Sequence, residues 1–502
     1  MNKQILKNIL FNIINFVVNV VIGLALTPYL IKKLGIAAYG LIPLAMFLSS
    51  YIGVLTQSLT ASVNRFLINE LQNNNIAESN KVFNTALITM LIMVLFIFLV
   101  FLWPVINIES FIAVPISYET EASTLFLLML FSVLVSLISS IFSVSMYANN
   151  RIDLMQCVNI VKNLTRLVSI VIMFGCQFFS LEVFGYSVLI SEIVALSLYV
   201  NYWRTKTPYL NLNVRNFDYK KLKKITNISS WLIVDQIGTI VLSKSDLLLV
   251  NKNFGSSVSG KYAIIAQFSD LLRAMASLVG GVMGPVMMIL HSQNNQKKMV
   301  ELTSVFMIAL SLILAIPIVL LCVFSKQILS LWVGETFSDM SNLMWLLILP
   351  LIINLGTVPL FSINIALNKV KIPSLSNLFF GILGLLIAFV CLKFSNLGYY
   401  SIGIGFVFAT TLKNALFTPI YAAYILRVKI NTFLVVHFKT MSFASIFLII
   451  CYCINFYVYP TGYDVFIYML SLCLTGLLLA YFFIGVKSQK QIMEILKSKQ
   501  IK

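Results

Sequence analysis

The sequence has few charged residues, only 10% of the chain, whereas a soluble globular protein carries about 25%. It has two histidines, and its seven cysteines form neither a disulfide framework nor a metal-ligand spacing. No aromatic-basic platform or other nucleic-acid signature is present. No loop is long enough to form a soluble domain of useful size. These deficits exclude a soluble enzyme, a disulfide scaffold, a metal site and a nucleic-acid partner.

Hydrophobic residues make up 60% of the chain and are gathered in long blocks. Many blocks approach the roughly 20 residues that a helix needs to cross a hydrocarbon core of about 30 Å. Uninterrupted apolar runs of this length indicate helices rather than barrel strands. The first block, within residues 1–28, is interrupted by Asn8, Asn12, Asn15 and Asn19 and is followed by no convincing cleavage site, so it is expected to span rather than to act as a signal peptide. We therefore predict an all-α polytopic membrane protein.

Fourteen spanning helices are expected, separated by short loops. Their ranges are 8–31, 38–66, 82–106, 120–147, 155–178, 183–203, 226–250, 259–289, 302–325, 339–366, 374–394, 399–426, 437–458 and 464–486.

The distribution of Lys and Arg predicts the orientation. By count along the sequence, 24 of them lie in loops on the side of the termini and six in loops on the opposite side. Because cytoplasmic loops carry the excess of basic residues, both termini are predicted to be cytoplasmic.

Two echoes suggest an internal repeat. Leu34-Gly35 and Tyr39-Gly40 follow the first helix, and Phe254-Gly255 and Gly260 lie about 220 positions later. The segment 148–151 is echoed at 366–369 at nearly the same offset. We therefore expect two six-helix bundles at 1–203 and 226–426, a basic cytoplasmic linker at 204–225, and two additional helices with a basic tail at 427–502. Repeat-built transporters often hold their substrate between the repeats.

Several charged residues fall inside the predicted spans, where each costs roughly 2.5–3.5 kcal/mol on insertion scales. Arg166, Arg273 and Lys413 lie near mid-span, whereas Lys162, Lys244 and the flanking Arg65 lie nearer the ends and can snorkel. For Arg166, Arg273 and Lys413 we favour the interpretation that they face a cavity. The alternative is that they form structural ion pairs. If the cations face one cavity, its charge suits an anion, and arginine suits phosphate in particular.

Acidic residues in the spans are candidates for ion coupling. They are Asp235 and Asp246 on one stripe of the seventh helix, Asp270 in the eighth and Glu192 in the sixth. Asp270 and Arg273 are three residues apart and are expected to pair along one helix face. Asparagines recur every three or four residues from Asn8 to Asn19. Such stripes either line a hydrated cavity or hold neighbouring helices together.

Thr27-Pro28 with Leu34-Gly35-x3-Tyr39-Gly40, and Trp231, Asp235, Asp246, Gly255 and Tyr262, resemble polysaccharide-transporter proteins. These belong to the multidrug/oligosaccharidyl-lipid/polysaccharide (MOP) exporter superfamily, and the similarity is to its O-antigen flippase (Wzx-like) branch. The resemblance implies a V of two six-helix bundles around a cationic cavity. It also implies a bacterial cytoplasmic-membrane flippase that moves undecaprenyl-pyrophosphate-linked oligosaccharide outward by alternating access.

The same resemblance implies no cofactor, coupling to an H⁺ or Na⁺ gradient, and contacts with membrane lipids, a polysaccharide polymerase and a chain-length regulator. Three alternatives stay open. A cation-coupled multidrug exporter is disfavoured because the first helix has no carboxylate, whereas a lipid II flippase shares the expected fold and charge. A membrane-embedded polymerase, from a different class, lacks the expected catalytic constellation in this sequence.

Overall fold

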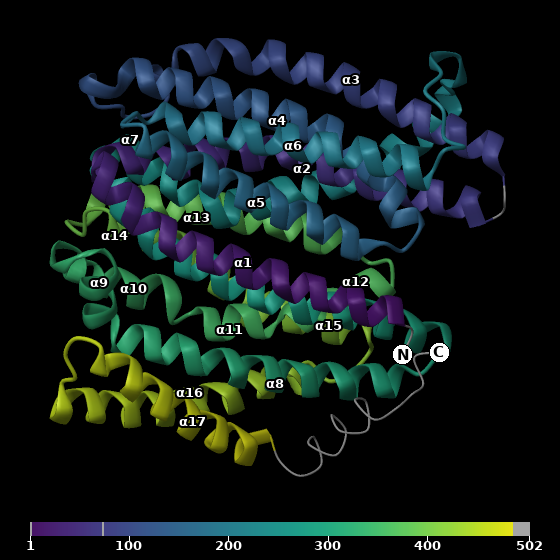
Figure 1. The fold of residues 1–502 in the computed structure, drawn as a ribbon. Coiled ribbons are helices and arrows are strands. Elements are labelled where there is room, and N and C mark those ends of the chain that lie inside the picture. Colours follow the sequence, from purple (N-terminus) through teal and green to yellow (C-terminus); the bar gives the residue numbers. More distant parts are fainter. Residues whose placement is uncertain (1–2, 73–74, 485–502) are drawn as a thin grey trace. The chain divides into compact units, whose positions relative to one another are not determined.

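The computed structural model describes residues 3–72 and 75–484, and the elements it describes are helical (Figure 1). They divide into two compact units by their contacts. The N-terminal unit comprises Met1–Ile240 and Leu247–Gly260, and the C-terminal unit comprises Val241–Asp246 and Lys261–Lys502. The division falls within one long helical element rather than at 204–225. The bundle boundaries expected from the sequence stay a prediction.

The N-terminal unit begins with six long helices. They are α1 (Lys3–Leu34), α2 (Ile36–Gln72), α3 (Ile76–Ile106), α4 (Glu119–Ala148), α5 (Ile152–Gly175) and α6 (Glu182–Lys206), with short 3₁₀ turns at Ile108–Ser110, Ile116–Tyr118 and Val214–Asn216.

The C-terminal unit contains most of the later elements. They are α8 (Gln296–Val323), α9 (Ser325–Val333), a 3₁₀ turn (Glu335–Met340), α10 (Ser341–Ile348), α11 (Leu351–Gly356), α12 (Val358–Ala366), α13 (Lys371–Phe394), α14 (Tyr400–Leu412), a π-helical turn (Lys413–Phe417), α15 (Thr418–Ile425), α16 (Asn431–Val458) and α17 (Asp464–Ile484). The element α7 (Tyr219–Ser292) is shared by both units.

Within the described residues, eleven helices are long and apolar enough to cross a membrane. The other three expected spans, 38–66 in α2 and 226–250 and 259–289 in α7, are helical and include positions whose side chains lie outside the described residues. The two segments of α7 carry the charged residues Asp235, Lys244, Asp246, Asp270 and Arg273. The spans expected at 339–366 and 399–426 are broken into shorter helices.

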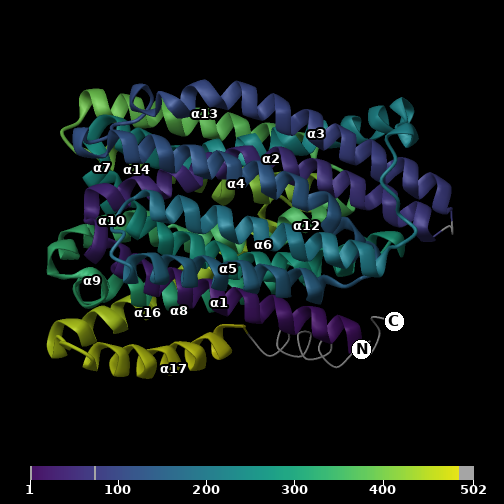
Figure 2. The ribbon, with the colours of Figure 1, turned by 45° about the horizontal axis from the view of Figure 1, so that its top comes forward.

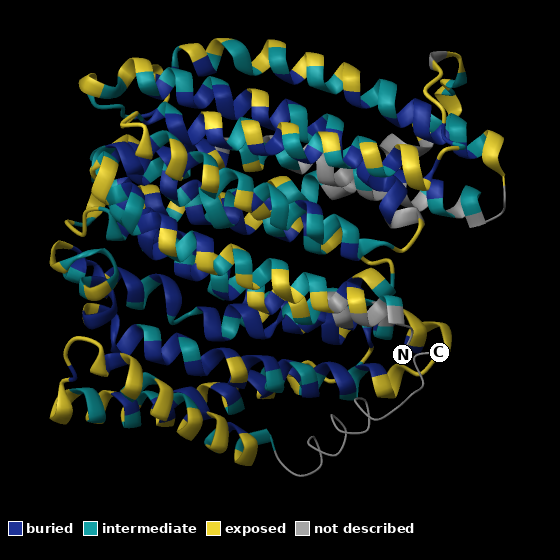
Figure 3. Cartoon of the chain, viewed as in Figure 1, coloured by how far each residue is buried: buried dark blue, intermediate teal, exposed yellow. Residues whose placement is uncertain are grey.

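In the N-terminal unit, α4 packs on α6, α2 and α3, and α5 packs on α6 and α1 (Figures 1 and 2). Close approach of α6 to α4 requires Gly185, because a Cβ there would lie 2.9 Å from Cβ of Leu128. The indole of Trp203 stacks on Phe83 and meets Phe142 edge-on, which joins α3, α4 and α6. Along α3 many residues remain exposed (Figure 3), as expected for a surface in contact with lipid acyl chains.

In the C-terminal unit, the long helix α8 is largely buried and is packed by α16, α17 and α11 (Figure 1). A buried apolar cluster joins it to the end of α7, to α12, to α15 and to α16; its members include Met287, Leu302, Leu360, Ala422 and Phe433. The pair α13 and α14 packs closely because Gly384 and Gly405 meet across it.

The α7 element is a helical hairpin. Gly255 has φ 83° and ψ 174°, a conformation that L-residues rarely adopt, and it separates two helical arms. Gly35, the echo of Gly255, has φ 81°. Asn150 and Asn368, which belong to the second echo, have φ 52° and 54°. The echoed positions thus share backbone conformations, which agrees with a duplication.

The basic linker lies along α3, held by two asparagines one turn apart. Asn80 accepts from the amide of Asn211 (2.7 Å) and donates to the carbonyl of Tyr209 (2.8 Å). Asn84 repeats this with Asn213 and Asn211, both at 2.8 Å. Near the end of the linker, in the first turn of α7, Lys221 forms ion pairs with Glu70 and Glu78. Burial alone lowers the pKa of Lys221, but these carboxylates more than offset it, so the pKa lies above its usual value.

Candidate functional site

The asparagine stripe of α1 meets α5 directly. Asn8 accepts from the backbone amide of Asp153 (3.0 Å), Asn15 donates to Gln156 (2.8 Å), and Asn163 donates to Asn19 (3.0 Å). The asparagines therefore join two helices along a polar seam, which corresponds to the helix-holding interpretation of the stripe.

At one end of this seam, Asp153 is almost fully buried and forms ion pairs with two basic side chains. Lys7 lies 3.2 Å from it and Arg151 3.0 Å from it, and Gln4 donates to it at 2.6 Å. This cluster ties the start of α5 to the start of α1. Nothing in the spacing of single helices indicated it, because its members come from both.

Three charged residues meet between α5 and α6. Lys162 pairs with Glu192 at 2.6 Å, and both side chains are partly buried. Arg166, one turn after Lys162, interacts electrostatically with the same Glu192. Its buried Nε has no hydrogen-bond partner, and Arg166 forms no ion pair within the described part of the chain. Two cations thus share one carboxylate, which leaves a net positive charge and an unused guanidinium donor.

The hairpin arms of α7 are tied by two polar contacts in the C-terminal unit. Lys244 pairs with Asp270, and the buried Tyr262 donates to Asp246 at 2.8 Å. The expected pairing of Asp270 with Arg273 is therefore wrong: the carboxylate joins the other arm. Arg273 makes no ion pair with any residue that the structure describes. Asp235 belongs to the N-terminal unit, so the single acidic stripe expected on this helix is divided between the units.

Lys413 is buried, 4% exposed, and begins the π-helical turn Lys413–Phe417. Its Nζ lies 5.2 Å from the centroid of the Phe361 ring, within the range of a cation–π interaction. The turn precedes Pro419, which lacks an N–H and whose ring would crowd the carbonyl four residues earlier in a regular helix. Widening the helix to a π-turn relieves this conflict. Such turns recur at functional sites.

A cluster of polar side chains surrounds the π-turn, and the sequence analysis did not predict this cluster. Asn414 donates to Asn354 (3.5 Å), Thr418 donates to Asn414 (3.4 Å), and Asn354 donates to Thr411 (3.3 Å). The sequence signal available was Lys413-Asn414 followed by Thr418-Pro419.

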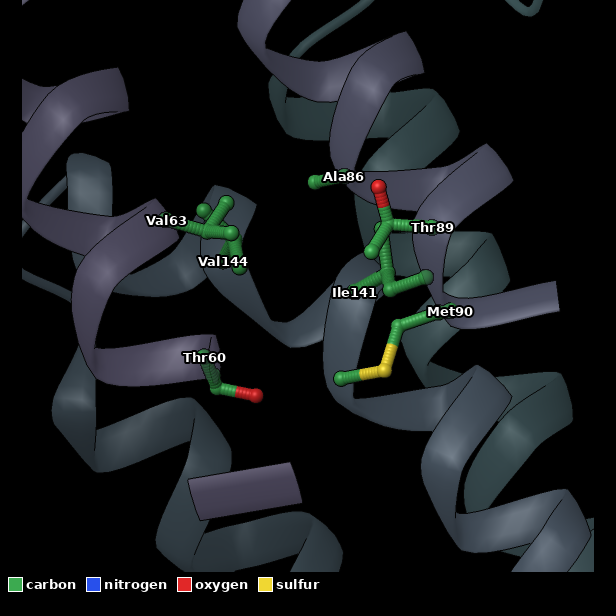
Figure 4. Close-up of a pocket in the computed structure, with 7 residues that line it drawn as sticks. All are labelled: Thr60, Val63, Ala86, Thr89, Met90, Ile141 and Val144. Carbon is green, nitrogen blue, oxygen red and sulfur yellow. The ribbon is translucent and has the colours of Figure 1, made fainter. Parts of the chain in front are cut away.

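Arg65, the cavity described below and a possible metal site add no residue to the polar and charged clusters described above. The side chain of Arg65 lies outside the described residues. A small cavity between α2, α3 and α4 is lined mostly by apolar groups, among them Val63, Met90 and Ile141 (Figure 4). Its lining offers no cation to an anionic ligand. Among the described residues no group of three His, Cys, Asp or Glu side chains could hold a metal ion.

Comparisons with known proteins point to one fold. No family model matches the chain. It is 26% identical over 433 residues to the "uncharacterized membrane protein EpsK" of Bacillus subtilis, covering 86% of both chains.

Two solved structures extend this likeness. The lipid II flippase MurJ in an inward closed conformation superposes with a TM-score of 0.71, covering 96% of this chain and all of that one at 17% identity. An inward-facing multidrug resistance MATE family transporter of the MOP superfamily gives 0.67 over 84% and 94% of the two chains, at 15% identity. The chain is thus a multi-pass, all-α membrane protein with the MOP-type fold that these transporters and flippases share.

Proposed function

We propose that the chain is a flippase that carries undecaprenyl-pyrophosphate-linked oligosaccharide, a repeat unit of O-antigen or a related surface polysaccharide, from the cytoplasmic to the outer leaflet by alternating access. It would lie in a bacterial cytoplasmic membrane with both termini inside. The fold supports a transporter, because the neighbours named above are a lipid II flippase and a multidrug transporter.

The proposed substrate class is supported mainly by which of the intramembrane Lys and Arg residues form ion pairs and which do not. Lys162 and Lys244 are engaged by Glu192 and Asp270, whereas Arg166 and Arg273 form no ion pair in the described part of the chain. A charge in the membrane without a carboxylate partner is retained for a reason, and a phosphate-bearing passenger supplies one. Lys413 is the third candidate for headgroup contact. Arg65, Lys162 and Lys244 are assigned supporting roles in the same cationic pathway.

The charges also bear on the rivals. A cation-coupled drug exporter is expected to use carboxylates in its first helix, but α1 carries none and its asparagines are bonded to α5. A lipid II flippase would need the same pyrophosphate contacts, so it stays the second candidate. Asp235, Asp246, Asp270 and Glu192 remain the proposed ion-coupling carboxylates.

The test follows lipid-linked oligosaccharide in spheroplasts of the native host after deletion of the gene, with leaflet location as the readout. Expected is intermediate trapped on the cytoplasmic side and released by the wild-type gene. Arg166→Ala and Arg273→Ala should relieve it poorly at matched expression. Arg215→Ala is the control, since this arginine is exposed in the linker, outside the spans.

Two outcomes would contradict the proposal. Normal export without the protein, in a strain with no redundant flippase, would remove the flippase assignment. Trapped lipid II with a normal distribution of the oligosaccharide intermediate would favour the lipid II alternative.

A further inference from the structure

His437 is buried in the C-terminal unit with neither ring nitrogen satisfied. It lies two turns into α16 and is 8% exposed, and no described group forms a hydrogen bond of ordinary geometry with Nδ1 or Nε2. Neutral imidazole has one donor and one acceptor nitrogen, and buried polar groups are almost always paired. A histidine kept at this position at the expense of two unmade hydrogen bonds needs an explanation.

The ring faces the π-turn. The backbone of Asn414 is the group that approaches His437, although not in the geometry of a full hydrogen bond. Asn414 belongs to the polar group formed with Asn354 and Thr418. On α12, which packs on α15, Asn364 is 4% exposed and its Oδ1 also lacks a described partner. The backbone carbonyl of Asn414 beside the ring is an acceptor, and an imidazolium has two N–H donors.

The elements packed on α16 are α8, α11, the π-turn, α15 and α17. Their titratable side chains, with those of α16 itself, are Lys413 on the π-turn; Tyr421 and Tyr424 on α15; Lys297, Lys298, Glu301 and Cys322 on α8; Asp464, Tyr468, Cys473 and Tyr481 on α17; and Lys439, Cys451, Tyr452, Cys453 and Tyr457 on α16. Of the charged members, Lys413 alone is buried.

We propose that His437 is a proton-binding residue of the transport cycle, which loads and releases a proton as the helices around the π-turn rearrange. Histidine is the side chain whose unperturbed charge change falls between pH 5 and 8. Ionisable groups within membrane spans commonly mark proton relays or substrate paths. A metal site does not fit, because His437 has no companion set of His, Cys, Asp or Glu ligands among the described residues.

The position of Lys413 supplies a link to the passenger, a step that rests on the proposed function. Lys413 is the chain neighbour of Asn414, so an imidazolium at 437 places a second positive charge by the same π-turn. Like charges in a low-dielectric interior disfavour each other, and an anionic headgroup at Lys413 relieves that repulsion. Proton binding at His437 and headgroup binding at Lys413 therefore favour each other, as reciprocal linkage requires.

The first experiment observes the imidazole itself. The chain has two histidines, so His291→Gln leaves His437 as its single imidazole, and His437→Gln leaves only His291, which is exposed at the end of α7. Each purified full-length variant, ¹⁵N-labelled at histidine in lipid nanodiscs, is titrated by NMR. We expect His437 to titrate reversibly between about pH 5 and 8. One unchanging protonation state across that range would overturn the proposal.

The second experiment measures movement of a lipid-linked oligosaccharide in proteoliposomes with and without an imposed pH gradient. His291→Gln should keep the wild-type response, whereas His437→Gln should fall to the rate measured without a gradient. An unchanged response in folded His437→Gln would overturn the proposal. If wild-type protein moves no substrate, the proposed function fails, and the NMR titration still decides the proton site because it needs no transport.

Discussion

Gly40 and Gly260 pack backbone against backbone within the N-terminal unit. A Cβ on Gly40 would lie 2.1 Å from the carbonyl oxygen of Ser256 and 3.0 Å from the nitrogen of Gly260. A Cβ on Gly260 would lie 2.8 Å from the carbonyl oxygen of Ile36. The two glycines are 220 positions apart, the offset of the sequence echo. The two echoed segments therefore pack against each other, with the turn of the α7 hairpin in contact with the start of α2.

Gly40→Ala should destabilise the protein, because the new methyl group meets backbone that cannot rotate away. Overpacking of this kind typically costs about 1–3 kcal/mol. Gly53→Ala on the same helix is the matched control: no atom lies within 4 Å of its Cβ position. Since alanine favours helix over glycine, that variant should be neutral or slightly stabilised. Thermal unfolding in one detergent compares them, and equal midpoints would contradict the contact.

Asn84→Ala should release the linker from α3. The buried Asn84 carboxamide satisfies both a carbonyl and an amide of the linker, so its loss leaves two backbone groups unpaired, at a cost of about 1–3 kcal/mol each if they stay buried. Limited trypsin digestion reads this out, because Arg215 lies in the linker. We expect faster cleavage there than in wild type. Asn107→Ala removes a partly exposed asparagine whose side chain bonds only the backbone at the end of α3, and it should digest normally.

The sequence predicts the helices well, because an apolar run long enough to span has no other way to satisfy its backbone. It also predicts a break between the helices at 226–250 and 259–289, where the structure places Gly255 in a positive-φ conformation. It does not predict which charges pair. Asp270 and Arg273 share a helix and seemed partners, but the reversal at Gly255 brings Lys244 from the opposite arm to Asp270.

The candidate site shows the same limit. The spacing of three or four residues between asparagines identified the polar stripe of α1, but whether Asn15 faces water or Gln156 depends on packing between helices. The π-turn at Lys413 arises from a conflict with Pro419, which a regular hydrophobic pattern conceals. His437 sits near a predicted span end and gave no signal, because an unpaired imidazole is recognised only when its neighbours are known.

Glu192→Leu should destabilise the protein more than Lys162→Leu. Removal of Glu192 leaves Lys162 and Arg166 side by side without a carboxylate, whereas removal of Lys162 leaves Glu192 with Arg166 nearby. Removing one partner of a buried ion pair leaves an uncompensated charge and costs about 3–5 kcal/mol. The partial exposure of Lys162 reduces this cost. Unfolding midpoints of both variants and of the double variant test it. Equal loss in the two single variants would show that Arg166 does not share the carboxylate.

Asp270→Asn separates stability from transport. Its pair with Lys244 is exposed to a similar degree on both sides, 48% and 37%, and such pairs contribute about 0–1 kcal/mol to stability. The unfolding midpoint should therefore change little. If Asp270 binds the coupling ion, as proposed, loss of its charge should abolish the response of transport to an ion gradient. Asp339→Asn, in a 3₁₀ turn outside the candidate groups, is the control. A variant that keeps both its stability and its full gradient response would remove Asp270 from the coupling candidates and leave Asp235, Asp246 and Glu192.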